Sequence, residues 1–180
     1  MKKIVTVFFL LIAFNSISAQ VKLEGIGLYG GLGTIKGNSA GVASFTTSAF
    51  LDTKWFFSDL VTFRFSFFYA RKFEALIASN SRAQYFPFHK GYSIKAVIEQ
   101  PLSEYIFLEE GAGFLFLNDR TFSNTNEWGI GITFHLVGGL DFRDDLGSGF
   151  KVGVGSEVGT TFTKTTPQFF SAHIQTAYYF

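Results

Sequence analysis

Residues 60–70 read LVTFRFSFFYA, and this stretch decides the fold class of the chain. Every second position carries a large apolar side chain, at Val61, Phe63, Phe65, Phe67 and Tyr69. The positions between them are mostly polar, at Thr62, Arg64 and Ser66. Because successive side chains of a β-strand point to opposite faces, the pattern predicts a strand with one apolar face.

The same alternation recurs along the chain. It is clear in 105–117 and in 128–142, where Ile, Leu and Phe alternate with Gly, Thr and His. Weaker alternation predicts strands at 21–33, 41–51, 91–99, 150–160 and 168–180, so that eight strands are expected in all. Glu110 interrupts the apolar face of 105–117, and we expect it near an interface or a bulge.

The connections alternate in length. Those at 34–40, 71–90, 118–127 and 161–167 are long or polar, whereas those at 52–59, 100–104 and 143–149 are short and rich in turn residues. Outer-membrane barrels alternate short periplasmic turns with longer surface loops. The predicted fold class is therefore all-β, an eight-stranded antiparallel transmembrane up-and-down β-barrel. Ala83–Phe88 is strand-capable, so an extended hairpin above the membrane is a further possibility within 71–90.

The first residues have the features of a cleaved secretory signal peptide. Lys2 and Lys3 form a basic start, Ile4 to Phe14 an apolar run, and residues 16–19 a small-residue stretch. The apolar run is too short for a membrane-spanning helix, which needs about 20 residues. We expect a signal peptide at 1–19, cleavage before Gln20, and one barrel domain at 20–180.

The composition excludes several classes of function. Without Lys2 and Lys3 the formal charge falls from +1 to −1, so there is no electrostatic case for binding nucleic acid. The chain has no Cys, which excludes thiolate metal sites. Its three His residues are isolated in sequence, and its glycines precede no helix that could cradle a phosphate. We expect neither a metal nor a cofactor.

The 25 Phe residues decide which face lies outside. A soluble ligand-carrying barrel also alternates, but eight strands enclose only a narrow interior. That interior suits small and paired charged residues, and the Phe-rich face suits lipid. His135 and His173 fall on the same inner face. The charged residues assigned to the interior are Arg64, Lys95, Glu99, Glu109, Asp141, Lys151 and Glu157.

Aromatic residues gather near the predicted strand ends. They either form a girdle at the membrane interface or reflect the ordinary strand preference of aromatic residues. The final Tyr178-Tyr179-Phe180 resembles the carboxy-terminal strand of bacterial outer-membrane proteins. That resemblance implies that the barrel assembly machinery reads Phe180. The aromatic residues concerned are Trp55, Trp128, Tyr29, Tyr69, Tyr92, Tyr178 and Tyr179.

The last eighty residues resemble the eight-stranded lipid A 3-O-deacylase family, through Leu108–Gly113, a polar loop and the terminal Tyr-Tyr-Phe. The family's catalytic motif overlays 154–159, where Ser156 and Gly159 match. Val154 stands at the His position, and Gln168 where the family has Glu. The resemblance implies ester hydrolysis by Ser156, with His173 and Glu157 as substitute partners. By alternation, however, Ser156 points to lipid and His173 inward.

We therefore expect a monomeric, non-enzymatic outer-membrane protein. Its partners would be outer-membrane lipid and lipopolysaccharide, and its surface loops would serve interaction or envelope integrity. The alternative is a lipid A deacylase-like esterase, or an inactive relative of one. A pore is disfavoured, because eight strands leave no wide channel and lumen charges of both signs should pair.

Overall fold

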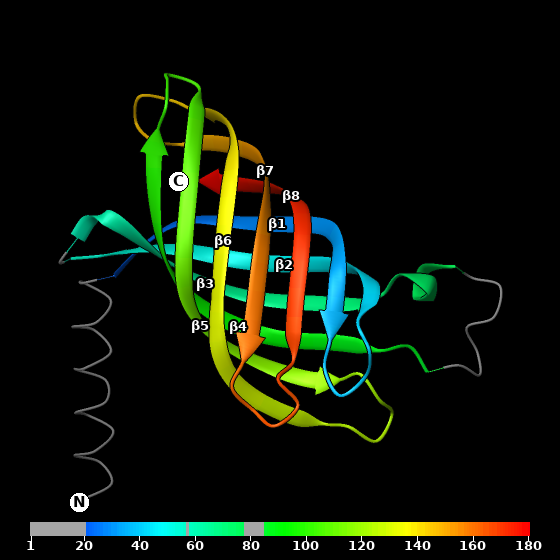
Figure 1. The fold of residues 1–180 in the computed structure, drawn as a ribbon. Helices are drawn as coiled ribbons and strands as arrows, with labels where there is room; N and C mark the ends of the chain where they lie inside the picture. The colour runs from blue at the N-terminus through cyan, green and yellow to red at the C-terminus, as the bar shows by residue number, and fades with distance from the viewer. Residues whose placement is uncertain (1–20, 57, 78–84) are drawn as a thin grey trace, which may run out of the picture.

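Eight antiparallel strands form one closed barrel in which β1 pairs with both β2 and β8 (Figure 1). The computed structural model describes residues 21–56, 58–77 and 85–180, so the expected signal peptide lies outside the described residues. The predicted fold of eight antiparallel strands is confirmed. The strands are β1 (Val21–Lys36), β2 (Val42–Trp55), β3 (Ser58–Lys72), β4 (Phe88–Pro101), β5 (Ile106–Arg120), β6 (Glu127–Arg143), β7 (Gly149–Thr161) and β8 (Gln168–Tyr179).

Several strands are longer than the sequence pattern suggested. Most of the connection expected at 52–59 is strand, because β2 continues to Trp55 and β3 begins at Ser58. The expected loop at 71–90 is also shorter: a 3-10 helix, η1 (Phe73–Leu76), follows β3, and β4 begins at Phe88. An extended hairpin is not seen in the described part of this segment. Residues 78–84 lie outside the described residues.

The two ends of the barrel differ. The end of β8 lies beside the start of β1, and this end also carries the short turns, such as 102–105 and 144–148 (Figure 1). The opposite end carries η1 and the connections at 37–41, 121–126 and 162–167. We call them the terminus end and the loop end. In the described residues no helix has the length and apolar character needed to cross a membrane.

Glycines on the inner face allow the strands to approach closely. A Cβ added at Gly31 would strike the backbone of Ala172 and His173 on β8, whereas one added at the neighbouring Gly30 would meet nothing. Gly31 faces inward and Gly30 outward. The glycine at position 31 therefore allows β1 and β8 to pack closely on the inner face.

Glu110 does not lie at a bulge. The pairing of β5 with β4 and β6 runs without a register shift, and such shifts occur instead at Leu23/Gly25 and Lys54/Trp55. Glu110 is exposed on the outer face, between Ile98 and Leu136. The location of Glu110 near an interface stays a prediction. A single polar residue in an alternating pattern does not distinguish a bulge from a regular ladder position.

Candidate functional site

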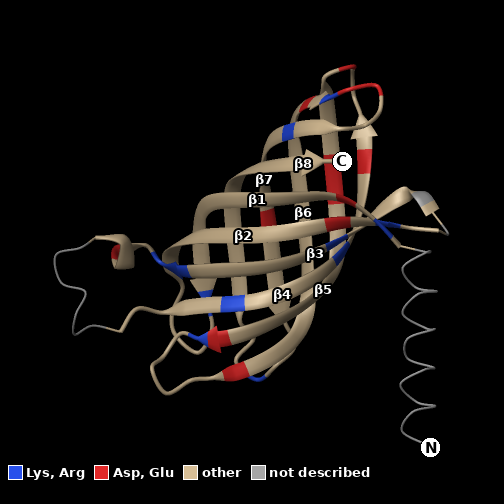
Figure 2. Ribbon diagram, turned by 180° about the vertical axis from the view of Figure 1, so that it is seen from behind, with Lys and Arg blue, Asp and Glu red and all other residues tan. Residues whose placement is uncertain are grey.

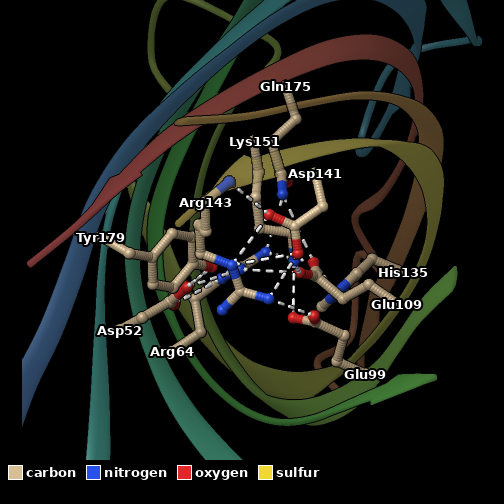
Figure 3. Close-up of polar contacts among 10 residues, drawn as sticks. All are labelled: Asp52, Arg64, Glu99, Glu109, His135, Asp141, Arg143, Lys151, Gln175 and Tyr179. Atoms are coloured by element: carbon tan, nitrogen blue, oxygen red, sulfur yellow. Dashed lines mark hydrogen bonds and ion pairs between the residues drawn. The ribbon is translucent and has the colours of Figure 1, made fainter. Parts of the chain in front are cut away.

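The centre of the lumen is organised around the Arg64 guanidinium, which is buried (Figure 3). Its Nε and Nη2 donate to the two Asp52 carboxylate oxygens, each at 2.7 Å. Its Nη1 and Nη2 donate to Glu109 at 2.6 and 3.1 Å. The same guanidinium stacks on Phe50, 4.0 Å from the ring centroid. The planar fork of arginine suits bidentate contact with carboxylates, so this single cation pairs with two buried acids at once.

Neighbouring side chains complete this network. Tyr179 donates its hydroxyl to Asp52 Oδ2 at 2.8 Å, and Gln175 donates to Glu109 at 3.4 Å. His135 Nε2 lies 3.0 Å from Glu109 Oε1. Each carboxylate at the centre is therefore bound from at least two strands, which ties the barrel wall together across the lumen.

A second cluster surrounds the Glu157 carboxylate on β7. It accepts hydrogen bonds from Lys95 Nζ at 2.9 Å, from the Tyr29 hydroxyl at 3.0 Å and from the Thr133 hydroxyl at 2.9 Å. His173 stacks on the Tyr29 ring, with centroids 4.1 Å apart. Glu157 is buried and surrounded by donors, so in this arrangement it accepts hydrogen bonds on both carboxylate oxygens.

Toward the terminus end the network meets a polar vestibule. Glu99 accepts from Arg143 Nη2 and Lys151 Nζ, both at 2.6 Å, and Arg143 also binds Asp141 (Figure 3). Beside these residues lies a cavity of about 240 Å³, bordered by Arg64 and Glu109. The vestibule is therefore closed on its inner side by the Arg64 network. As the sequence predicted, the lumen charges pair with one another.

Toward the loop end the lumen contains a cluster of apolar side chains. Phe68 and Phe169 stack at 4.6 Å between centroids, and the inward side chains around them are buried. We call this cluster the apolar plug; it comprises Ile35, Phe68, Ala70, Leu115, Leu117 and Phe169. The inner face therefore carries paired charges toward the terminus end and the apolar plug toward the loop end.

Above the plug, Asp119 holds two loops. Its Oδ1 accepts from the Thr121 backbone N–H at 2.9 Å and the Thr121 hydroxyl at 2.8 Å, and its Oδ2 accepts from the Asn38 N–H at 3.2 Å. His89 Nε2 lies 3.6 Å away. One buried carboxylate thus fixes the starts of the 37–41 and 121–126 connections.

The structure separates the candidate catalytic residues. Ser156 pairs with Leu136 and Ala172 in an outward position, whereas Glu157 and His173 are buried on the lumen side. The Ser156 hydroxyl therefore has no neighbouring base among them, and an unactivated hydroxyl is a weak nucleophile. In the described residues, no three metal-ligating side chains gather in one place.

Sequence reasoning missed part of the network. Their position near strand ends predicts Tyr29 and Tyr179 as interface aromatics, but both point into the lumen as buried hydrogen-bond donors. The connection predicted at 52–59 includes Asp52, but Asp52 lies in β2 opposite Arg64. The alternation of Asp52 and Lys54 with Thr53 and Trp55 could have extended the strand. Trp128, Tyr69, Tyr92 and Tyr178 do lie on the outer face.

The outer face is broadly apolar. Phe114, Val154 and Ile174 expose 73%, 66% and 64% of their surface, and similar residues surround the barrel. Near the loop end Phe116 and Trp128 stack at 4.6 Å, and Tyr92 stacks on Trp128 at 6.4 Å. An exposed apolar surface of this extent is unusual for a soluble protein and typical of a lipid-facing band.

Comparison with known proteins identifies the fold. No protein-family profile and no curated protein matches the sequence. Neisserial surface protein A superposes with a TM-score of 0.70 at 6% identity, over 89% of this chain and 99% of that one. Two further matches are less similar: Yersinia pestis Ail (0.47, 12% identity, 89% and 99% covered) and the N-terminal β-barrel domain of Pseudomonas aeruginosa OprF (0.43, 10%, 88% and 100%). The chain has the fold of an eight-stranded outer-membrane β-barrel, and the deacylase resemblance rests on the sequence alone.

Proposed function

We propose that the chain is an integral outer-membrane protein that acts through its surface loops, in interaction or envelope integrity, and that it neither conducts nor hydrolyses. The observation that carries the proposal is the filled lumen. Its charges bind one another, and the apolar plug occupies the loop end. With the interior occupied, contacts with other molecules are left to the loops and the outer face.

The outer face supports insertion in lipid. Phe, Ile, Leu and Val side chains point outward from all eight strands, and transfer of such surface from water to lipid is favourable. The closed barrel satisfies its backbone hydrogen bonds without a free edge, as a membrane-spanning sheet must. By the usual arrangement, the short turns would face the periplasm and the loop end the cell surface.

Phe180 supports the proposal that the assembly machinery recognises the chain end. Its side chain is half exposed on the outer face, and its backbone N–H donates to the Glu24 carbonyl at 2.9 Å. The aromatic ring is therefore available at the seam where β8 closes against β1. Phe180→Ser would reduce the amount of folded barrel in the outer membrane while leaving export unchanged.

The experiment that tests the function combines fractionation with electrical recording. The full chain should collect in the outer-membrane fraction, run faster on a denaturing gel before boiling than after, and give no conductance steps in a planar bilayer. Folded protein in plain buffer without detergent would contradict membrane insertion. Regular conductance steps would contradict the closed lumen.

The role of the loops is tested in a strain that lacks the protein. Phe122 and Phe162 are exposed at the loop end, and Leu146 is exposed in a short turn at the terminus end. The strain that lacks the protein should be sensitive to detergent. Expression of the wild-type chain or of the Leu146→Ser variant should restore its resistance. The double variant Phe122→Ser/Phe162→Ser should fold but fail to restore it. Full restoration by the double variant would count against a role for the loops.

A further inference from the structure

Three cations lie side by side on the outer face at the loop end. Arg71 of β3, Phe88 of β4 and Arg120 of β5 are paired in register across three adjacent strands, and Lys90 follows Phe88 on the same face. Figure 2 shows Lys and Arg at the loop ends of these strands. We call Arg71, Lys90 and Arg120 the rim cations.

The rim cations have no acidic partner in the described part of the chain, unlike the paired cations of the lumen. Within residues 21–56, 58–77 and 85–180, no ion pair involves any of the three, and the Nε atoms of Arg71 and Arg120 are buried without a hydrogen-bond acceptor. Both guanidinium groups lie near aromatic rings, with Arg71 5.7 Å from Phe86 and Arg120 5.7 Å from Phe88. A buried hydrogen-bond donor without an acceptor costs free energy. An anion that accepted hydrogen bonds from the two arginine side chains would remove this cost.

The acidic residues at the loop end do not pair with the rim cations. Glu74 binds Lys72 at 2.8 Å, and Asp119 points inward to Thr121 and Asn38. Glu127 makes no ion pair among the described residues. The sequence of 78–84, ASNSRAQ, contains no Asp or Glu that could supply a carboxylate. The local charge is therefore positive.

The position of the rim cations specifies the kind of anion. Outward-facing aromatic rings lie between the rim cations and the middle of the barrel. Tyr69 pairs with Lys90 across the strands, and the rings of Phe67 and Tyr92 contact each other with centroids 5.3 Å apart. Aromatic residues of this kind mark the boundary between lipid and water. An anion bound by the rim cations would thus sit at headgroup level, with apolar surface directly below it for acyl chains.

We propose that the rim cations bind the phosphorylated headgroup of an outer-leaflet glycolipid, whose acyl chains pack along Phe67, Tyr92 and Phe116. Arginine forks match phosphate oxygens bidentately, and Lys90 adds a mobile third charge. The inference rests on the proposed membrane orientation and adds a specific lipid site to it. Two arginines on either side of Phe88 fix the spacing of the site, because their strands are held in register.

The test measures lipid binding by the full chain folded in neutral phosphatidylcholine nanodiscs. A doubly phosphorylated glycolipid and its dephosphorylated counterpart are titrated in, and inorganic phosphate is titrated separately. The wild type should prefer the phosphorylated lipid. Each rim cation near the surface contributes about fivefold to the affinity, so Arg71→Gln/Arg120→Gln should weaken binding by about 25-fold.

Matched variants separate the site from general charge. Lys36→Gln removes an exposed outward cation at the loop end of β1, two strands away, and should leave binding unchanged. Arg71→Lys/Arg120→Lys retains the charge but removes the bidentate forks, so it should bind the phosphorylated lipid more weakly than the wild type, and it serves if the glutamine variant does not fold. The folding of every variant is checked by its change in mobility on a denaturing gel after boiling.

If the protein folds normally in lipid, two results would refute the proposed lipid site without refuting the proposed function. One is equal binding of phosphorylated and dephosphorylated lipid by the wild type. The other is inorganic phosphate binding as tightly as the glycolipid, which would indicate a free-anion site. Failure of the wild type to fold in bilayers would instead overturn the proposed function, and the lipid site with it.

Discussion

Replacement of Arg64 by Met should destabilise the barrel strongly. The change removes the cation that binds both Asp52 and Glu109, and it leaves two buried carboxylates without their main partner. Removal of one member of a buried ion pair costs about 3–5 kcal/mol. Because Arg64 pairs with two buried acids, we expect the free energy of unfolding to fall by at least about 4 kcal/mol.

The assay is urea unfolding in phospholipid vesicles, followed by tryptophan fluorescence and by the gel shift on boiling. Lys54→Met is the matched control, since Lys54 pairs with Glu24 at 3.1 Å but is 37% exposed. An ion pair exposed to this degree contributes at most about 1 kcal/mol. Adding Asp52→Asn to Arg64→Met should recover part of the loss by removing one unpaired charge. A loss below about 1 kcal/mol for Arg64→Met would refute the account of the lumen network.

Three further predictions concern the wall and the outer face. Gly31→Ala should prevent stable folding because its Cβ would strike the β8 backbone, whereas Gly30→Ala should fold normally; heat-modifiability distinguishes them. Glu110→Leu should raise the free energy of unfolding by about 1–2 kcal/mol, because it removes a carboxyl from the lipid-facing band, and a loss of stability would show that Glu110 has a partner. Ser156→Ala should leave the lipid A composition of a membrane extract unchanged relative to wild type, and restored deacylation by the wild type alone would revive the esterase hypothesis.

The fold was readable from the sequence because side-chain alternation reports directly on strand faces. The alternating apolar residues from Val61 to Tyr69 point outward and Arg64 points inward, as predicted. Phe68 is also apolar but points inward, into the apolar plug. The positions at which strands end were harder to predict from the sequence. Asp52 and Lys54 look like turn residues until Arg64 and Glu24 are seen across from them, since the partners of polar residues near a strand end are far away in sequence.

The division of the lumen into a polar half and an apolar plug could not be predicted. Which inward residues share a layer depends on the tilt and stagger of the strands, and neither is encoded in a local pattern. Tyr29 and Tyr179 show the same limit. Each lies on the inner face by alternation, but only the assembled barrel brings their hydroxyl groups to Glu157 and Asp52.

The most direct test of the central claim is the depth and direction of two adjacent residues of β5. Phe114 is 73% exposed on the outer face, and Leu115 is 1% exposed in the apolar plug. Tryptophan is placed at each position in turn after Trp55 and Trp128 are changed to Phe. In vesicles of lipid brominated along the acyl chains, fluorescence at 114 should be strongly quenched and fluorescence at 115 should not. Equal quenching at both positions, or quenching at 115 alone, would contradict a barrel whose phenylalanine-rich face meets the lipid.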